Sequence, residues 1–295
     1  MATTRHLEVS PGLRIAVDED GDPNGEPVFF FHGWPASRLQ GAGFGPDARE
    51  LGARIISPDR PGIGLSSYQA GRRLTDWPAQ VLAIARQLGI ERFRVLAISG
   101  GGPYAFATAH ALPDRVQAAA VVSGAPPLGS DVDDRALLAV YRWLLSAHRR
   151  QPGLIRGLFG IARPFATIQP PRWMWPLILR FIPPADRAAL ADPAVFEGSF
   201  GCYREAWRGS ARGVVSDAEI YANEWGFRPE DIRVPVRLWH GQADRSFSWR
   251  LAEALASRLP DCNARFVENE GHYSLPIRHS RAILADLLTC APARR

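Results

Sequence analysis

Short apolar runs alternate along this chain with longer segments whose apolar residues recur at helical spacing. Most of the runs are apolar at nearly every position, which is typical of strands that helices cover on both faces of a sheet. We expect strands at Arg5–Ser10, Leu13–Asp20, Pro27–Phe31, Arg54–Asp59, Val95–Ile98, Gln117–Val122, Val234–Trp239 and Ala264–Glu268. Strands that alternate with helices predict an α/β fold with a mostly parallel central sheet flanked by helices.

The alternation breaks in the middle of the chain. From Pro126 to Glu230 the pattern is helical, with breaks at proline and glycine and without a convincing strand. The helical patterns are clearest at Arg135–His148, Trp173–Ile182 and Pro193–Trp207, where Asp192 is placed to cap the third. We therefore expect a core made of residues 1–126 and 231–295, interrupted by an all-helical insertion over residues 127–230.

The run Val95–Ile98 leads directly into Ser99, three glycines and Pro103. Pro103 suits the first turn of a helix, because its missing N–H would have no partner there. A strand that turns so sharply into a helix tolerates only small neighbours, which here are Ala97 and Gly101. Such a corner lifts the Ser99 hydroxyl above the sheet edge. The free N–H groups at the start of the helix then point toward any developing anion.

The segment Ala97-Ile98-Ser99-Gly100-Gly101 resembles the nucleophile elbow of the α/β-hydrolase family, written G-x-S-x-G, with Ala97 in place of the first glycine. An ordinary serine in a glycine-rich turn is the alternative interpretation. A phosphate-binding loop does not fit, because the three glycines lack both the lysine of a Walker sequence and the spacing G-x-G-x-x-G.

A serine hydroxyl becomes an effective nucleophile when a base takes its proton and a third group orients that base. Asp244 follows the strand that ends at Trp239, and His272 follows the strand that ends at Glu268. The carboxyl ends of parallel strands share one edge of the sheet, so both residues are expected at the same edge as Ser99. The order Ser99, Asp244, His272 is that of the α/β-hydrolases.

Nearly the whole core is similar to small bacterial α/β-fold hydrolases with a helical cap, and the cap segment itself shows no recognisable motif. The motifs that carry the resemblance are His32–Pro35, Asp59–Ser66, Ala97–Pro103, His240–Asp244 and Gly271–His272. This resemblance implies that Ser99 is the nucleophile, that His272 is the general base and that Asp244 orients His272. It also implies an oxyanion hole made by the backbone N–H groups of Trp34 and Gly100. We expect neither a cofactor nor a metal ion.

Other residues compete for these roles. The family's alternative place for the acid follows Gln117–Val122, where no carboxylate occurs before Asp131, and this favours Asp244. His32 and His240 also lie at strand ends. We expect both histidines to satisfy backbone groups of their own loops.

Many proteins of this kind hydrolyse carboxylic esters, so the resemblance implies a carboxylesterase acting on small, mainly apolar esters of short to medium chain length. Haloalkane dehalogenases and epoxide hydrolases share the core and the cap but use an aspartate nucleophile, and Ser99 argues against both. Cofactor-free perhydrolases or haloperoxidases, lactonases and carbon–carbon bond hydrolases keep the same three residues and remain open. A small-molecule receptor with slow turnover is a further alternative.

Composition narrows this picture only slightly. The net charge of +5 is scattered, and no basic helix with interleaved aromatic residues indicates nucleic acid. All 35 basic residues are arginine, which excludes a lysine-anchored cofactor. Cys202, Cys262 and Cys290 lack the spacing of a metal site, and we expect reduced thiols in a cytoplasmic protein. Neither a signal peptide nor a bilayer-spanning segment is expected.

The helical insertion is rich in both charge and apolar residues. Residues 135–185 contain eight arginines, no Asp or Glu, and three tryptophans. This combination is compatible with a basic lid at a membrane surface. We expect instead a cap that turns its apolar faces to the core, without membrane contact. Several of its large residues should then line the pocket: Leu154, Ile155, Leu158, Phe159, Phe165, Trp173, Trp175, Phe196 and Phe200. Arg142 or Arg163 is a candidate anchor for an anionic substrate.

Overall fold

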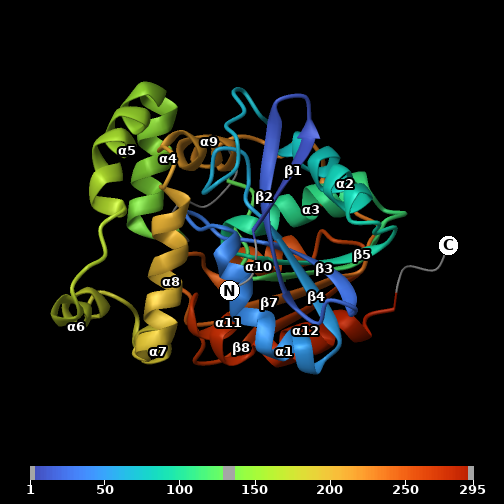
Figure 1. Cartoon of the computed structure of the whole chain (residues 1–295). Helices are drawn as coiled ribbons and strands as arrows, with labels where there is room; N and C mark the ends of the chain where they lie inside the picture. The colour runs from blue at the N-terminus through green and yellow to red at the C-terminus, as the bar shows by residue number, and fades with distance from the viewer. Residues whose placement is uncertain (1–3, 129–136, 292–295) are drawn as a thin grey trace.

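The computed structural model describes residues 4–128 and 137–291. Its centre is an eight-stranded sheet in the order β1-β2-β4-β3-β5-β6-β7-β8 (Figure 1). The strands are β1 (Arg5–Ser10), β2 (Leu13–Gly21), β3 (Glu26–Phe31), β4 (Ala53–Pro58), β5 (Phe93–Ile98), β6 (Val116–Val122), β7 (Val236–Gly241) and β8 (Cys262–Val267). The β1–β2 and β2–β4 pairs are antiparallel and the other pairs are parallel. The expected α/β fold with a mostly parallel sheet is confirmed.

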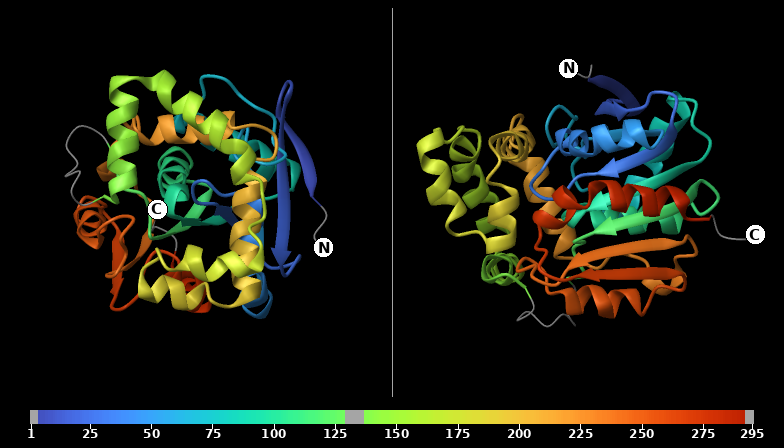
Figure 2. Two further views of the ribbon diagram at one scale, coloured as in Figure 1. Left: turned by 90° about the vertical axis from the view of Figure 1, so that its left-hand side faces the viewer. Right: turned by 90° about the horizontal axis from the view of Figure 1, so that it is seen from below.

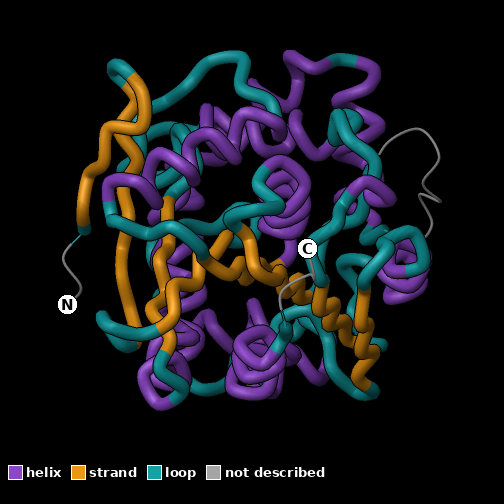
Figure 3. The backbone as a smooth tube through the Cα atoms, turned by 90° about the vertical axis from the view of Figure 1, so that its right-hand side faces the viewer, coloured by secondary structure: helices purple, strands orange, loops and turns teal. Residues whose placement is uncertain are grey.

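Helices cover both faces of the sheet, which explains why its strands are apolar at consecutive positions. In β3, Phe29 and Phe31 share one buried cluster with residues of α2, α3 and α10. Val28 and Phe30 share a second cluster with residues of α1 and α12. Figure 3 shows helices on both sides of the strands. The core helices are α1 (Gly45–Glu50), α2 (Trp77–Gln87), α3 (Gly102–Ala111), α10 (Trp249–Ala256), α11 (Ser274–Arg278) and α12 (Ser280–Thr289).

Between β6 and β7 the described residues form helices and turns, apart from one bridge between Leu137 and Phe247. The helices are α4 (Ala139–Arg150), α5 (Pro152–Ala166), α6 (Trp175–Leu179), α7 (Pro184–Ala189), α8 (Pro193–Ala206) and α9 (Arg212–Tyr221). We call α4–α9 the helical insertion. It stands at one side of the sheet, and from that side its helices frame a view of α3 (Figures 1 and 2). Asp192 caps α8 as expected, because its Oδ1 accepts the N–H of Ala194.

The expectation that the insertion turns its apolar faces to the core is wrong for one side of α5 and for the turns that flank α6. Phe165, Trp173 and Phe181 are each more than 70% exposed, and so is Ile161. Other large side chains do turn inward, as Trp175 does by stacking on Phe196 with ring centroids 4.2 Å apart. The insertion therefore has a packed inner side and an apolar outer side.

Three further expectations concern the whole chain. Cys202, Cys262 and Cys290 are free thiols in the structure. Within the described residues, no group of three or more His, Cys, Asp or Glu is arranged to hold a metal ion. No helix in the described part of the chain is long and apolar enough to span a membrane.

The first prediction concerns the corner at Ser99. A Cβ on Gly101 would lie 2.1 Å from the carbonyl oxygen of Phe31, and neither backbone can move without separating β3 from β5. Gly101→Ala should lower the free energy of unfolding by about 2 kcal/mol or more. A Cβ on Gly157 in α5 would instead point into open space, and alanine favours a helix more than glycine does. Gly157→Ala should therefore stabilise the protein by about 0.5–1 kcal/mol. Urea unfolding measures both, and equal effects would contradict the steric argument.

Candidate active site

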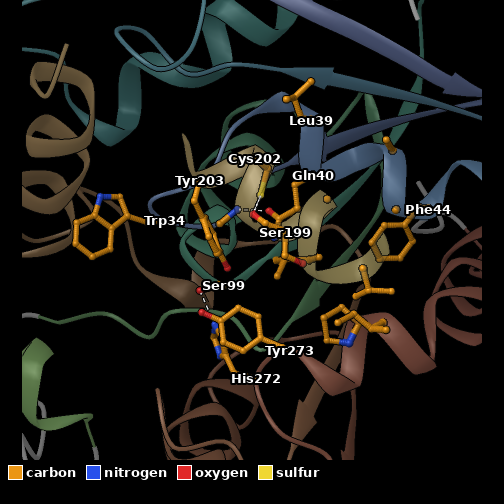
Figure 4. A pocket seen from close by; sticks show the side chains of 18 of the residues that line it. Trp34, Leu39, Gln40, Phe44, Ser99, Ser199, Cys202, Tyr203, His272 and Tyr273 are labelled. Carbon is orange, nitrogen blue, oxygen red and sulfur yellow. Dashed lines mark hydrogen bonds between the residues drawn. The ribbon is translucent and has the colours of Figure 1, made fainter. Parts of the chain in front are cut away.

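Ser99 occupies the corner between β5 and α3 in a backbone conformation that side chains rarely adopt. Its φ is +52°, in the left-handed region that L-residues with a Cβ avoid. Two constraints hold it there: the close approach of Gly101 to Phe31, and the hydrogen bond from the Ala125 N–H to the Ser99 carbonyl at 2.9 Å. The corner directs the Ser99 side chain toward His272 (Figure 4).

The structure brings the three side chains expected from the sequence into one hydrogen-bonded chain. His272 Nε2 lies 2.9 Å from Ser99 Oγ, and His272 Nδ1 lies 2.8 Å from Asp244 Oδ2. All three residues are buried. Because Asp244 accepts a proton at Nδ1, the neutral imidazole keeps Nε2 free to accept the Ser99 O–H. The arrangement can therefore deprotonate the hydroxyl.

Asp244 is held as a carboxylate. Burial alone would raise its pKa, but the charge on His272 and the hydrogen bonds from His240 and His272 hold the pKa of Asp244 well below its ordinary range. Its Oδ1 also accepts the backbone N–H groups of Ser246 at 2.7 Å and Phe247 at 3.2 Å. These bonds fix the carboxylate plane, and with it the orientation of the imidazole.

His240 does more than the sequence suggested. Its Nε2 donates to the carbonyl of Phe247 at 3.0 Å, as expected of a residue that satisfies its own loop. The same atom lies 3.3 Å from Asp244 Oδ2, so the carboxylate oxygen that holds His272 also contacts a second imidazole. The spacing of four residues between His240 and Asp244 was a signal, but only the geometry of the loop brings the two side chains together.

His32 has the structural role expected of it. Its Nδ1 lies 2.9 Å from the carbonyl oxygen of Gly33, and its Nε2 accepts the N–H of Arg60 at 3.4 Å. Burial, with the charge of Arg60 acting in the same direction, holds the pKa of His32 well below its ordinary range. His32 is therefore a neutral side chain that shapes the loop leading to Trp34.

The two expected oxyanion donors come from neighbouring backbone segments. A Cβ built on Gly100 would lie 3.1 Å from the Trp34 nitrogen, so the two residues face each other across a narrow gap. Within the described residues the Trp34 N–H has no hydrogen-bond acceptor. An unpaired N–H beside a nucleophile is what an oxyanion site requires.

A buried ionic network, which the sequence did not reveal, holds the loop that carries Trp34. The Arg60 guanidinium donates to the carbonyls of His32 at 2.7 Å and Gly33 at 2.9 Å. Asp217, from α9 of the insertion, accepts from Arg60 at 2.8 Å and from Tyr104 at 2.7 Å, and it also pairs with Arg72. Although burial opposes ionisation, the two guanidinium groups hold the pKa of Asp217 well below its ordinary range.

A second carboxylate of the insertion holds the loop that carries His272. Asp186 of α7 is buried and accepts three backbone N–H groups, from His272 at 3.1 Å, Tyr273 at 2.9 Å and Ser274 at 2.8 Å. Asp186 lies 86 residues before His272, and nothing in the local sequence indicated the contact. The insertion thus contacts the loops on both sides of Ser99.

Two cavities meet at Ser99. The larger, about 440 Å³, runs between the 3₁₀ segment Arg38–Phe44 and helices α8 and α11, and His272 and Tyr273 line it. The smaller, about 60 Å³, lies beyond Gly100 and is lined by apolar residues of α4 and by Phe247. Cys202 lies in the wall of the larger cavity, where burial raises the pKa of its thiol to about 12. It is therefore not a competing nucleophile at neutral pH.

The cavity walls differ from the expectation in two respects. None of the nine large apolar residues named for the pocket lines either cavity. They pack within the insertion, as Phe196 and Phe200 do, or point outward, as Phe165 does. Arg142 and Arg163 are also absent from both cavity walls. Arg163 donates instead to the carbonyls of Trp207 and Arg208, which directly follow α8. The alternative acid Asp131 lies outside the described residues.

The second prediction concerns the protonation of His272. Burial would lower its pKa, but the charge and hydrogen bond of Asp244 outweigh burial and raise the pKa above 6.5. A pKa raised on folding means that the interaction stabilises the protein fully below pH 6.5, and that this stabilisation is lost as the pH rises through the folded pKa. Asp244→Asn should lower the His272 pKa and flatten this dependence. NMR titration of the imidazole measures the shift, and an unchanged pKa would contradict it.

Comparisons with known proteins agree with this architecture. The family model described as the alpha/beta hydrolase fold matches residues 26–277. A proline iminopeptidase of Neisseria gonorrhoeae is 34% identical over 119 residues, which cover 38% of this chain and 37% of that protein. A non-heme chloroperoxidase of Streptomyces lividans is 33% identical over 153 residues, which cover 49% of this chain and 55% of that protein. The chain thus matches only about a third to a half of the length of these relatives.

The likeness to solved structures extends over nearly the whole chain. A bromoperoxidase from Bacillus anthracis superposes with a TM-score of 0.71 at 18% identity, covering 97% of this chain and 99% of that one. At this level of identity the superposition shows a shared fold and carries no statement about the reaction.

Proposed function

This chain belongs to the alpha/beta hydrolase fold family, and we propose that it is a serine hydrolase that cleaves carboxylic esters through an acyl-enzyme. The observation that carries the proposal is the hydrogen-bonded chain from Ser99 through His272 to Asp244. Its support is geometric: a hydroxyl, a neutral imidazole and a carboxylate lie in the order that nucleophilic catalysis needs.

In the proposed reaction, His272 takes the Ser99 proton while Oγ attacks the ester carbonyl. The negative charge that develops on the carbonyl oxygen is stabilised by the N–H groups of Trp34 and Gly100. His272 then gives its proton to the leaving alcohol, and the C–O bond breaks to leave an ester on Ser99. A water molecule then attacks that ester while His272 takes its proton. The bond to Ser99 Oγ breaks, the carboxylic acid leaves, and His272 returns the proton to Ser99. Asp244 stabilises the imidazolium in both steps.

The two cavities suit the two halves of an ester. The leaving alcohol must lie next to His272, which protonates it, and His272 lines the larger cavity and not the smaller one. The acyl group then points past Gly100 into the smaller cavity. A water molecule needs roughly 10–15 Å³ by the same measure, so the smaller cavity of about 60 Å³ holds a short acyl chain. We therefore propose short acyl groups and larger, mainly apolar alcohols.

The helical insertion supplies much of both cavity walls, and we propose that residues 127–230 act as a cap that selects the substrate. Helix α8 contributes Val195 and Tyr203 to the larger cavity, and α4 contributes Leu144 and Leu145 to the smaller. No charged side chain occurs among the described lining residues except His272, when it is protonated. This favours a neutral substrate.

Two alternatives follow from the relatives. One is a peptidase activity, suggested by the proline iminopeptidase relative. A peptide with a free N-terminus carries a cationic amine, and the described cavity walls contain no Asp or Glu to pair with it. Perhydrolysis is the stronger second candidate, supported by a bifunctional esterase/perhydrolase of Acinetobacter calcoaceticus that is 33% identical over 130 residues, which cover 42% of this chain and 45% of that protein. In that reaction hydrogen peroxide replaces water as the group that attacks the acyl-enzyme, and a peracid is released.

The third prediction tests the nucleophile. Ser99→Ala should abolish hydrolysis of p-nitrophenyl acetate, because it removes the hydroxyl that lies 2.9 Å from His272 Nε2 and forms the ester intermediate. The variant should keep the wild-type melting temperature within a few degrees, since only one hydroxyl is lost. Substantial turnover in this folded variant would sink the mechanism. Binding with negligible turnover by the wild type would favour a receptor instead.

The fourth prediction tests the acid. Asp244→Asn should lower kcat by about 10⁴, because the amide stabilises the wrong imidazole tautomer and carries no charge. His240→Gln is the matched control, because it removes the second imidazole and leaves the carboxylate in place, and it should cost far less. A nearly silent Asp244→Asn, together with an essential carboxylate near Asp131–Asp134, would show that the acid lies elsewhere.

The fifth prediction tests the orientation of the ester. In a series of alkyl acetates, each added methylene of the alcohol should raise kcat/KM by up to roughly fourfold until the larger cavity is full. In a series of p-nitrophenyl esters, kcat/KM should fall once the acyl chain exceeds about four carbons. The reverse pattern would exchange the roles of the two cavities. Peracid formation with hydrogen peroxide, measured alongside, tests the perhydrolase alternative.

A further inference from the structure

The outer side of the helical insertion carries nearly all of the exposed large apolar side chains. Of the twelve such residues in the described chain, ten lie between residues 138 and 181. The other two are Leu39, which lines the larger cavity, and Tyr68. Scattered apolar residues are ordinary on a protein surface, whereas a concentration in one short segment marks an interaction site.

Seven of the ten form two stripes at helical spacing. The first stripe runs along α5 and its following turn, and the second runs along α6 and its flanking turns. The two stripes consist of Leu154, Ile161, Phe165 and Ile168, and of Trp173, Leu177 and Phe181. Residues three, four or seven positions apart share one face of a helix. These seven residues, which we call the outer face, are between 45% and 82% exposed.

The apolar residues on the inner side of α5 already pack against other parts of the protein. Ile155 is buried, and Phe159 packs against the rings of Trp34 and Trp207 with centroids 5.9 and 5.7 Å away. A surface helix normally carries one apolar stripe, directed to the core. Helix α5 carries a second stripe directed away from it. Both α5 and α6 lie on the side of the insertion that is remote from the sheet (Figures 1 and 2).

The charge of the same segment is strongly one-sided. Residues 135–185 contain eight arginines and no acidic residue. Arg142, Arg150 and Arg180 are exposed, and Arg172 beside Trp173 is 77% exposed although it pairs with Glu197 at 2.9 Å. A guanidinium binds a phosphate group through two parallel hydrogen bonds. A surface of anionic lipid headgroups presents many such phosphate groups.

We propose that the outer face docks on an anionic lipid membrane surface. The aromatic and aliphatic side chains of α5 and α6 enter the boundary between headgroups and acyl chains, and the surrounding arginines bind lipid phosphates. Trp173 suits this boundary because an indole has an apolar ring and one polar N–H. Docking in this way places the insertion, which lines both cavities, against the lipid and keeps the sheet in water.

Charge argues against a second copy of this chain as the occupant. In a symmetric dimer the same surface meets itself, so the exposed Arg142, Arg150 and Arg180 of one copy would approach those of the other, and residues 135–185 contain no acidic residue to compensate them. Like charges at an interface oppose association. An anionic lipid surface instead gains from each arginine that approaches it.

The test is flotation of the full-length protein with lipid vesicles, which does not depend on hydrolytic activity. Vesicles of phosphatidylcholine with an equal part of phosphatidylglycerol should carry the protein upward, and vesicles of phosphatidylcholine alone should not. The double variant Trp173→Ser/Phe181→Ser should lower the partition coefficient at least about tenfold. Arg180→Gln should lower it roughly fivefold, and about 0.5 M salt should weaken the binding of the wild type.

Matched controls come from the core surface. Tyr68→Ser removes an exposed aromatic ring and Arg92→Gln an exposed charge outside the insertion, and both should float as the wild type does. All altered residues are exposed, so the variants should fold, which their melting temperatures check. The proposal is overturned if the wild type floats with neither vesicle or if the double variant floats equally well. It is also overturned if sedimentation shows a dimer that the double variant converts to monomer.

Discussion

The close approach of two backbones at the end of β5 is the constraint on which the rest of the candidate site depends. Gly101 packs so tightly against the Phe31 carbonyl that the chain can turn into α3 only with Ser99 in the left-handed region. The same contact brings the start of α3 against the loop after β3, so that Gly100 faces Trp34. One steric condition therefore positions both the Ser99 hydroxyl and the backbone N–H groups that are expected to stabilise the oxyanion formed when this hydroxyl attacks. The sheet around Ser99 maintains its strained backbone conformation.

The insertion is tied to this corner by buried charges. Asp217 meets Arg60 and Arg72, and Asp186 accepts the backbone N–H groups around His272. A buried ion without its partner costs about 3–5 kcal/mol, so α7 and α9 cannot leave the core without stranding charges. Within the described residues, α6 has no such buried ionic contact, and its outward side is apolar. The inner side of the insertion is thus bound to the core, whereas its outer side is exposed. This division suits a cap whose inner side lines the cavities and whose outer side binds a partner.

The sequence predicted the sheet well because a strand buried on both faces must be apolar at every position, as Phe29 and Phe30 are on opposite faces. It also indicated which residues would meet, since Ser99, Asp244 and His272 each follow a parallel strand and such strands end at one edge. It could not indicate the direction in which the insertion's apolar residues point. Helical spacing is the same for an inward and an outward stripe, and only the packing of Ile155 and Phe159 shows which side of α5 meets the core. The sequence also could not predict the role of Asp186. Its partners are backbone N–H groups, which nearly every residue has, so no side-chain pattern marks them.

The contact of His240 with Asp244 shows how the loop after β7 sets the electrostatics of the site. The Nε2 of His240 faces two acceptors, the Phe247 carbonyl and Asp244 Oδ2, so this nitrogen carries a proton and donates toward both. This hydrogen bond helps to hold Asp244 as a carboxylate, and the charge of that carboxylate raises the pKa of His272. The loop after β7 therefore fixes the Asp244 carboxylate at both oxygens, because His240 contacts Oδ2 and the backbone N–H groups of Ser246 and Phe247 donate to Oδ1.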